Sequence, residues 1–537
     1  MNRWLKSGAP WIWLTAGAVS LSLIVVLGLL LLIGWKGLGY FWPAPVYQFE
    51  IEQNGHQSTV IGEVYERKTV PVKQLTEAGI NTTGFDGDPV FRFVIKTGNR
   101  DVLGSDFVTI LGPHIVSQEP AAGVAVIERL KNGRFYGFPI RLIEDGVEIP
   151  LEELEHSLEK ANSVRDLISQ IEQSDLVELN QQFEQLNAKA LQHEAPSQLI
   201  GERQLLEQRF VHIEQQLLTL HQQLSRDRLI VREMTGQEIT LPLEQILDLW
   251  YPNDFTTAGK LGHWLSQLGH FVSDDPREAN TEGGVFPAIF GTVFMVLLMS
   301  VIVTPLGVMA AVYLHEYAGK SIFTKLIRVA VINLAGVPSI VYGVFGLGFF
   351  VYIVGAQIDD LFFADQLPAP TFGTPGILWS ALTLAILTLP VVIVSTEEGL
   401  ARIPTSIRHG SLALGATQAE TLWRTVLPMA SPAIMTGLIL AVARAAGEVA
   451  PLMLVGVVKM APSLPIDGQF PYLHLDRKFM HLGYHIYDVG FQSPNVEAAR
   501  PLVYATSFLL VTVIVGLNLT AIGIRNHLRE KFRSLEQ

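Results

Sequence analysis

The sequence predicts an all-α polytopic membrane protein of six transmembrane helices, with an inserted α+β domain on one side of the membrane. Hydrophobic residues make up 49% of the 537 residues and the mean hydropathy is +0.32, which is high for a soluble chain. Six predominantly apolar segments are each long enough to cross a hydrocarbon core of about 30 Å. Residues 34–284 carry a net charge of −16 within a chain of net charge −13. One acidic, water-soluble block therefore interrupts an apolar protein.

The first predicted span, Trp11–Ile33, has no charged residue and is rich in Leu, Ile and Val. It is longer than the apolar region of a secretory signal and lacks a small-residue cleavage site, so we expect a retained anchor. The other five predicted spans are Phe286–Leu314, Leu326–Gly355, Ile377–Ser395, Ala433–Val457 and Leu502–Ile524.

The distribution of Lys and Arg predicts the topology, because positive residues collect in cytoplasmic flanks. The two termini and the loops after the second and fourth spans are basic, whereas the loop at residues 356–375 has no Lys or Arg. Lys459, Arg477 and Lys478 weaken this pattern without reversing it. We therefore expect both termini in the cytoplasm and the acidic block outside.

The acidic block, residues 34–284, contains two kinds of sequence pattern. Residues 46–150 alternate short β-prone runs with turn residues, and 226–245 resembles them. Between these, residues 151–225 have a helical period broken at Pro196, which predicts an antiparallel helical hairpin. After Pro196, apolar residues recur at spacings of 4, 3, 4, 3 and 4, which is typical of a coiled coil. These residues are Leu206, Phe210, Ile213, Leu217, Leu220 and Leu224. The hairpin is either a structural projection or a docking site for a soluble partner.

Several classes of chemistry are excluded. The chain has no cysteine, so disulfides and thiolate metal sites are impossible. His315 and Glu316 lack a third ligand, so we expect interface residues and no metal site. The phosphate-binding motif G-x-x-x-x-G-K-[ST] is absent, and no nucleophile–base pattern stands out. The acidic balance argues against nucleic acid. We expect no catalytic residues and no cofactor.

The segment between the fourth and fifth spans, residues 397–432, predicts a docking loop. Within it, His409–Pro432 can form short amphipathic helices that fit a groove of a soluble partner. Gly415 permits a turn between two helices, and Pro428 fixes where the next span begins. Glu397 and Glu398 are expected to be solvated charges. The alternative is an ordinary basic loop.

Four strings carry a resemblance to a known family. They are GGVFPAIFGT at residues 283–292, AVYLHEYA at 311–318, VPSIVYGVFGL at 337–347 and AAGEVAPL at 445–452. From Gly283 to its end the chain resembles the PstA-type permease of the phosphate ABC importer. Residues 34–284 are not covered by this resemblance, because typical members have a much shorter connection there. Val449 stands where Thr is usual, and His409-Gly410-Ser411 stands where Glu-Ala-Ala is usual.

The resemblance implies the type I permease fold of ABC importers and a non-catalytic translocation subunit in the bacterial inner membrane. The predicted spans and the acidic block divide the chain into an N-terminal tail and first span (1–36), an extracytoplasmic insert (37–280) and a five-helix permease core (281–530). The implied partners are a homologous second permease, a cytoplasmic ATPase dimer, an extracytoplasmic phosphate-binding protein and membrane lipid. The implied docking residues are Arg408, His409, Ser411, Gly415, Ala416, Glu420, Leu427 and Pro428; the implied gate or packing residues are Pro338, Ser339, Tyr342 and Gly343.

Arg444 and Glu448 are the candidate substrate-pathway residues. They are four apart within the predicted fifth span, so we expect them on one helix face near its middle. A charge at that depth is costly and usually faces a bundle interior or a pathway. Arginine suits the implied oxyanion because its planar fork donates two parallel hydrogen bonds. The alternative is a permanent ion pair that locks helix packing.

Two other functions stay open. Loops of this kind recur in importers of other oxyanions, so molybdate, tungstate or sulfate are alternative substrates. A membrane-anchored phosphate-sensing or scaffold protein, with the external hairpin as its working part, belongs to a different class.

Overall fold

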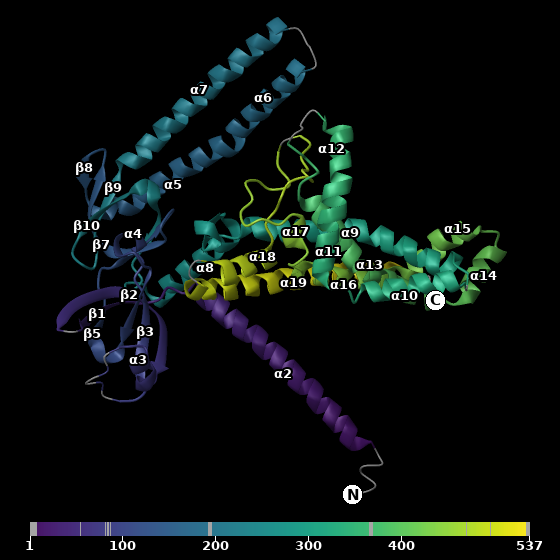
Figure 1. The fold of residues 1–537 in the computed structure, drawn as a ribbon, viewed down its shortest axis with the longest axis horizontal. Helices are drawn as coiled ribbons and strands as arrows, with labels where there is room; N and C mark the ends of the chain where they lie inside the picture. Colours follow the sequence, from purple (N-terminus) through teal and green to yellow (C-terminus); the bar gives the residue numbers. More distant parts are fainter. Residues whose placement is uncertain are drawn as a thin grey trace. The chain divides into compact units, whose positions relative to one another are not determined.

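The computed structural model describes residues 8–53, 55–80, 82, 85, 87–191, 196–319, 321–364, 369–468, 470–493 and 496–532. The chain forms two compact units. The first unit comprises Met1–Phe41 and Gly269–Gln537, and the second comprises Trp42–Leu268. Figure 1 traces their elements, and we describe each unit by itself.

Six helices of the described residues are long and apolar enough to cross a membrane, which confirms the predicted number. All six belong to the first unit. The candidate spans are Trp11–Gly39, Phe286–Tyr317, Ser339–Phe362, Ile377–Ala401, Gln418–Gly447 and Ala499–His527. Their main helices are α2 (Ala9–Gly39), α9 (Phe286–Val312), α11 (Ser339–Phe345), α13 (Ile377–Ala401), α16 (Leu427–Gly447) and α19 (Val496–Phe532).

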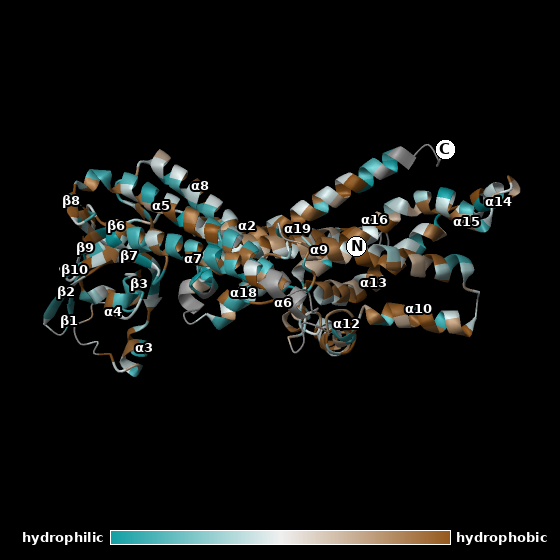
Figure 2. Cartoon of the chain, turned by 90° about the horizontal axis from the view of Figure 1, so that it is seen from above, coloured by the Kyte–Doolittle hydropathy of each residue, from teal (hydrophilic) through white to brown (hydrophobic). Residues whose placement is uncertain are grey.

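The core of the first unit lies among α9, α13 and α16, where buried residues such as Met299, Leu384 and Ala441 form one cluster. Hydrophobic residues also cover much of α9, α10 and α13 in Figure 2. Small residues let these helices approach closely. A Cβ added at Gly307 would lie 2.6 Å from the Val392 side chain.

The predicted third span, Leu326–Gly355, is wrong as a single helix. The chain forms α10 (Ile322–Leu334), breaks before Pro338, and resumes as α11. Pro338 has no N–H to continue a helix, and its ring disfavours the helical conformation at the preceding residue. After α11 the helix continues through a π-helical segment (Gly346–Gly355) into α12 (Ala356–Phe362). The start of the predicted loop 356–375 is therefore helical.

Asp359 ties the segment after α12 back to that helix. Its side chain is 1% exposed, and its two carboxylate oxygens accept hydrogen bonds from the backbone N–H groups of Phe372 and Gly373, each at 2.7 Å. These bonds satisfy a buried charge and fold the following segment back onto the helix.

The second unit contains two antiparallel sheets. The first has the order β4-β3-β2-β1-β5 and buries Phe49, Ile95 and Ile110. The second has the order β10-β9-β7-β6-β11, with β8 paired to β7. Asn132 and Gly133, with φ of 68° and 69°, make the tight turn between β6 and β7. The strands are β1 (Val46–Gln53), β2 (His56–Val70), β3 (Val90–Lys96), β4 (Phe107–Leu111), β5 (Ile115–Pro120), β6 (Ala125–Arg129), β7 (Arg134–Glu144), β8 (Val147–Ile149), β9 (Arg228–Arg232), β10 (Glu238–Pro242) and β11 (Ile246–Trp250).

The helices of the second unit include α5 (Leu154–Gln170), α6 (Leu176–Leu191) and α7 (Pro196–Arg226). Leu179 of α6 and Ile213 of α7 share a buried apolar cluster, so the two helices pack together. The hairpin connection at residues 192–195 lies outside the described residues. The coiled-coil geometry stays a prediction. The remaining helices of this unit are α3 (Val72–Glu77), α4 (Arg100–Leu103) and most of α8 (Thr257–Ser273), whereas the short strands β12 (Pro276–Arg277) and β13 (Glu282–Gly283) belong to the first unit.

A buried polar cluster surrounds α18 (Leu482–Tyr487), between the fifth and sixth candidate spans. Asp488 is 1% exposed, with Lys459 Nζ 3.1 Å from its Oδ2. Asn280 Nδ2 donates to the same oxygen at 3.2 Å. Burial lowers the pKa of His481 and of His485 to about 4 each. For His485, Asp488 opposes this shift and Lys459 adds to it.

The α18 cluster predicts acid sensitivity. Between an unfolded pKa of 6.5 and a folded pKa of about 4, the unfolded state binds more protons. The free energy of unfolding is therefore highest above pH 6.5, where both histidines are neutral in the folded and unfolded states. It decreases as the pH falls toward 4, by at most about 3 kcal/mol per histidine. We expect the melting temperature of the purified chain, followed by tryptophan fluorescence, to fall between pH 7 and 4.5. His485→Gln should flatten this dependence; an unchanged slope would contradict the assignment.

Candidate functional site

The predicted docking loop folds as two short helices joined at Gly415. These are α14 (Thr405–Ala413) and α15 (Gln418–Thr421), and a π-helical segment (Leu422–Val426) leads into α16. Gly415 has a φ of 92°, and nothing lies within 4 Å of a Cβ placed there. Its backbone conformation, rather than a lack of space, favours glycine.

Local hydrogen bonds fix the start of α15. Thr417 and Glu420 form a reciprocal capping box, which satisfies two N–H groups at the helix N-terminus. The Ser411 and Thr421 hydroxyls lie 2.9 Å apart and join α14 to the end of α15. Leu427 begins α16 with Pro428 in its first turn, where a missing N–H costs nothing.

The docking segment, which we define as α14, α15 and their connection, presents apolar side chains to the surface. Leu414 is 91% exposed, and Trp423 just beyond the segment is 73% exposed. His409 is also exposed, whereas Ala416 is half-buried. Exposed apolar side chains beside polar ones are typical of a surface that binds another protein.

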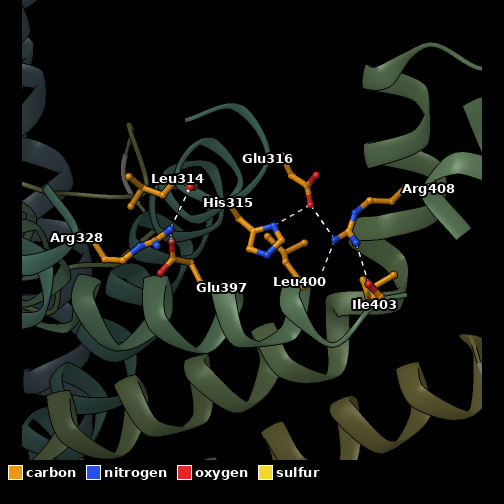
Figure 3. Close-up of polar contacts among 8 residues, drawn as sticks. All are labelled: Leu314, His315, Glu316, Arg328, Glu397, Leu400, Ile403 and Arg408. Atoms are coloured by element: carbon orange, nitrogen blue, oxygen red, sulfur yellow. Dashed lines mark hydrogen bonds and ion pairs between the residues drawn. The ribbon is translucent and has the colours of Figure 1, made fainter. Parts of the chain in front are cut away.

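Arg408 holds the docking segment to the ends of two candidate spans (Figure 3). Its Nη1 donates to the Ile403 carbonyl at 2.8 Å, and its Nη2 donates to the Leu400 carbonyl at 2.8 Å. Nη2 also lies 2.9 Å from Oε1 of Glu316, in the π-helical segment Tyr313–Tyr317 that follows α9. His315 Nδ1 lies 3.0 Å from the same carboxylate oxygen.

A second arginine makes a similar connection nearby. Arg328 of α10 donates through Nη2 to the Leu314 carbonyl at 3.2 Å and to Glu397 of α13 at 3.1 Å. The expectation of solvated charges is wrong for Glu397, which lies inside α13 and is only 17% exposed, whereas Glu398 is exposed as expected. Arg328 and Glu397 are 69 positions apart, so no local sequence pattern predicts their contact.

Arg444 and Glu448 lie at the end of α16 rather than on one helix face. The helix ends at Gly447, and Glu448 is extended, with φ −80° and ψ 131°. The predicted continuous span Ala433–Val457 is therefore wrong, and Pro451 further disfavours helical backbone at the residue before it. A short helix, α17 (Leu452–Val455), follows the break.

The two side chains still meet, with Arg444 Nε 3.5 Å from Oε1 of Glu448. Arg444 is 31% exposed and Glu448 21%. Within the described residues, the two terminal nitrogens of the Arg444 guanidinium make no hydrogen bond. One edge of the guanidinium is therefore free to donate two parallel hydrogen bonds.

The broken third span contacts this break. A Cβ on Gly343 would lie 2.7 Å from the Pro451 Cα, so α11 approaches the backbone directly. Tyr342 is close enough to Arg444 for an electrostatic interaction, and its hydroxyl donates to the Leu334 carbonyl at 2.6 Å. Pro338 and Ser339 begin α11. The predicted gate and pathway residues Tyr342, Gly343 and Arg444 thus converge on two helix breaks.

Six candidate spans, with an exposed helical segment from α14 to α15 that overlaps the start of the fifth, define a multi-pass membrane protein. The chain belongs to the family of binding-protein-dependent transport system inner membrane components, whose model matches residues 303–534.

Curated relatives agree with this assignment. The phosphate transport system permease protein PstA of Mycobacterium leprae is 31% identical over 287 residues, which are 53% of this chain and 83% of that protein. PstA 1 of Mycobacterium tuberculosis is 38% identical over 286 residues, 53% of this chain and 83% of that protein. A solved structure of the inward-facing MetNI methionine ABC transporter is 17% identical with a TM-score of 0.34, covering 45% of this chain and 94% of that one.

The chain is therefore a non-catalytic, multi-pass permease component of an ABC importer. An importer of this kind works with an ATPase and a solute-binding protein.

Proposed function

We propose that this chain is the permease subunit of an ABC importer for inorganic phosphate. The observation that carries the proposal is the free edge of the Arg444 guanidinium, held by Glu448 at a helix break. A planar fork matches phosphate oxygens better than a point charge does. Relatives from two mycobacteria named as phosphate permeases support phosphate as the solute.

The basic flanks support a topology in which both termini and the docking segment are cytoplasmic. In that orientation the segment reaches two copies of an ATPase, and the insert 37–280 lies in the periplasm. A phosphate-binding protein delivers the solute there, and a second, homologous permease completes the pathway.

The proposed mechanism is alternating access. ATP binding closes the ATPase dimer, the docking segment follows it, and the helices around the two breaks rearrange. Arg444 then holds the oxyanion through charge-assisted hydrogen bonds until the pathway opens to the cytoplasm. Glu448 holds the guanidinium in place between transport events.

Measured uptake tests the substrate. Cells lacking this chain should lose high-affinity uptake of radiolabelled phosphate, and the restored chain should recover it. Uptake of molybdate, tungstate and sulfate should remain at the level of the parent cells. Unchanged phosphate uptake together with lost molybdate, tungstate or sulfate uptake would assign the chain to another oxyanion.

A further inference from the structure

We propose that Glu316 is a positioning residue that couples the docking segment to the membrane helices. This inference rests on the proposed docking role of α14 and α15. Glu316 lies at the end of the second candidate span, whereas Arg408 lies within α14, 92 residues later. The ion pair between them makes movement of the docking segment act on that span.

Arg408 is suited to transmit movement because it joins three elements. It extends from α14, and it donates to the carbonyl of Leu400 at the end of α13 and to that of Ile403 in the turn that follows. The last carbonyls of a helix have no partner within the helix, so a donor there stabilises the helix end. Glu316 supplies the third connection, to the end of the second span. Without Glu316, Arg408 would connect α14 only to α13 and not to the second span.

The burial of the pair makes this connection strong. Arg408 is 15% exposed and Glu316 12%, so water screens their attraction less than it screens a surface ion pair. Figure 3 shows the Glu316 carboxylate between His315 and Arg408. His315 restricts the rotamers of the carboxylate, which favours one geometry of the pair.

A local irregularity in the helix aims Glu316 at its partner. Residues Tyr313–Tyr317 form a π-helical turn that ends with the Ala318 N–H donating to the Tyr313 carbonyl at 2.8 Å. A π-turn contains one residue more than an α-turn, so it changes the direction of the side chains that follow it. This explains how an acidic residue at the end of an apolar span reaches α14.

The neighbouring pair of Arg328 and Glu397 provides a matched control. It has a similar length and joins α10 to α13, and Arg328 also donates to the Leu314 carbonyl at the end of the second span. It holds α10, however, and not α14. Loss of this pair removes an ion pair of similar length, although one in which Arg328 is 47% exposed, without releasing the docking segment.

The test uses the assembled importer in proteoliposomes with its ATPase and solute-binding protein. Glu316→Gln keeps the side-chain shape and removes the charge. We expect it to keep ATP hydrolysis and lower the phosphate imported per ATP by about tenfold, the loss expected for one charged hydrogen bond. Glu316→Asp should recover part of the ratio, and Glu397→Gln should retain it. A wild-type ratio in Glu316→Gln overturns the proposal.

A second readout does not depend on the solute. Because the chain has no cysteine, Gly410→Cys on α14 and Val301→Cys on α9 give two unique spin-label sites. Both positions are exposed. The distance distribution between the labels should broaden in Glu316→Gln and stay narrow in Glu397→Gln. If the wild-type importer does not carry phosphate, the proposed substrate fails while this measurement still decides the coupling role, and an unbroadened Glu316→Gln distribution overturns that role.

Discussion

Replacing Arg444 with alanine is expected to lower phosphate import by about 100-fold or more, while the chain still assembles with its ATPase. A charged hydrogen bond contributes about 1.5–3 kcal/mol, and each 1.4 kcal/mol corresponds to a factor of ten. The alanine variant loses two such bonds to the oxyanion. Uptake in proteoliposomes measures phosphate import, and co-purification of the ATPase measures assembly.

Three variants separate a pathway role from a structural ion pair. Arg444→Lys keeps the charge without the planar fork, so it should recover only part of the uptake. Glu448→Gln should leave more activity than Arg444→Ala, because Glu448 only orients the guanidinium. Arg500→Ala, on the exposed start of α19, removes an equal charge and should change nothing. If Arg444→Ala and Glu448→Gln both lose the ATPase, the pair is structural and the pathway role is wrong.

Local features of this chain could be predicted from the sequence. Apolar length alone predicted six spans, because each needs only enough hydrophobic residues to cross a membrane. The turn at Gly415 could also be predicted, since a left-handed backbone conformation favours glycine. The Thr417–Glu420 capping box has the same local character, although its spacing was not used in the prediction.

The helix breaks were harder to predict, although Pro338 and Pro451 were visible. A proline in an apolar run either kinks a helix or ends it, and the surrounding packing decides which. Here both runs end, and the two breaks pack against each other through Gly343 and Pro451. Hydropathy could not show this, because the residues on both sides of each break remain apolar.

The ion pairs at the ends of the spans were missed for a different reason. Glu316 and Glu397 each contact an arginine far away in the sequence, at separations that no local period encodes. The visible signal was an acidic residue directly after or within the end of an apolar span. Such a residue indicates that a charged or polar partner lies nearby, but it does not show which residue that partner is.

Replacing Gly343 with leucine is the second variant from which we expect a large effect. The Cβ alone would lie 2.7 Å from the Pro451 Cα and 3.0 Å from its carbonyl oxygen, and neither backbone atom can rotate away. Overpacking of this kind costs about 1–3 kcal/mol. Relief requires α11 to move away from the break that positions Arg444. We therefore expect a lower melting temperature and at least about tenfold lower uptake.

Gly348 gives the matched control for this variant. It lies five residues later in the same helical stretch, is exposed, and has nothing within 4 Å of a Cβ placed there. Gly348→Leu makes the same change in helix propensity and hydrophobicity without the clash. If both leucine variants lose uptake equally, flexibility of the helix is what matters. If only Gly343→Leu loses it, transport depends on the close approach of α11 to the break beside Arg444, because Gly343 is buried against that break and Gly348 is exposed.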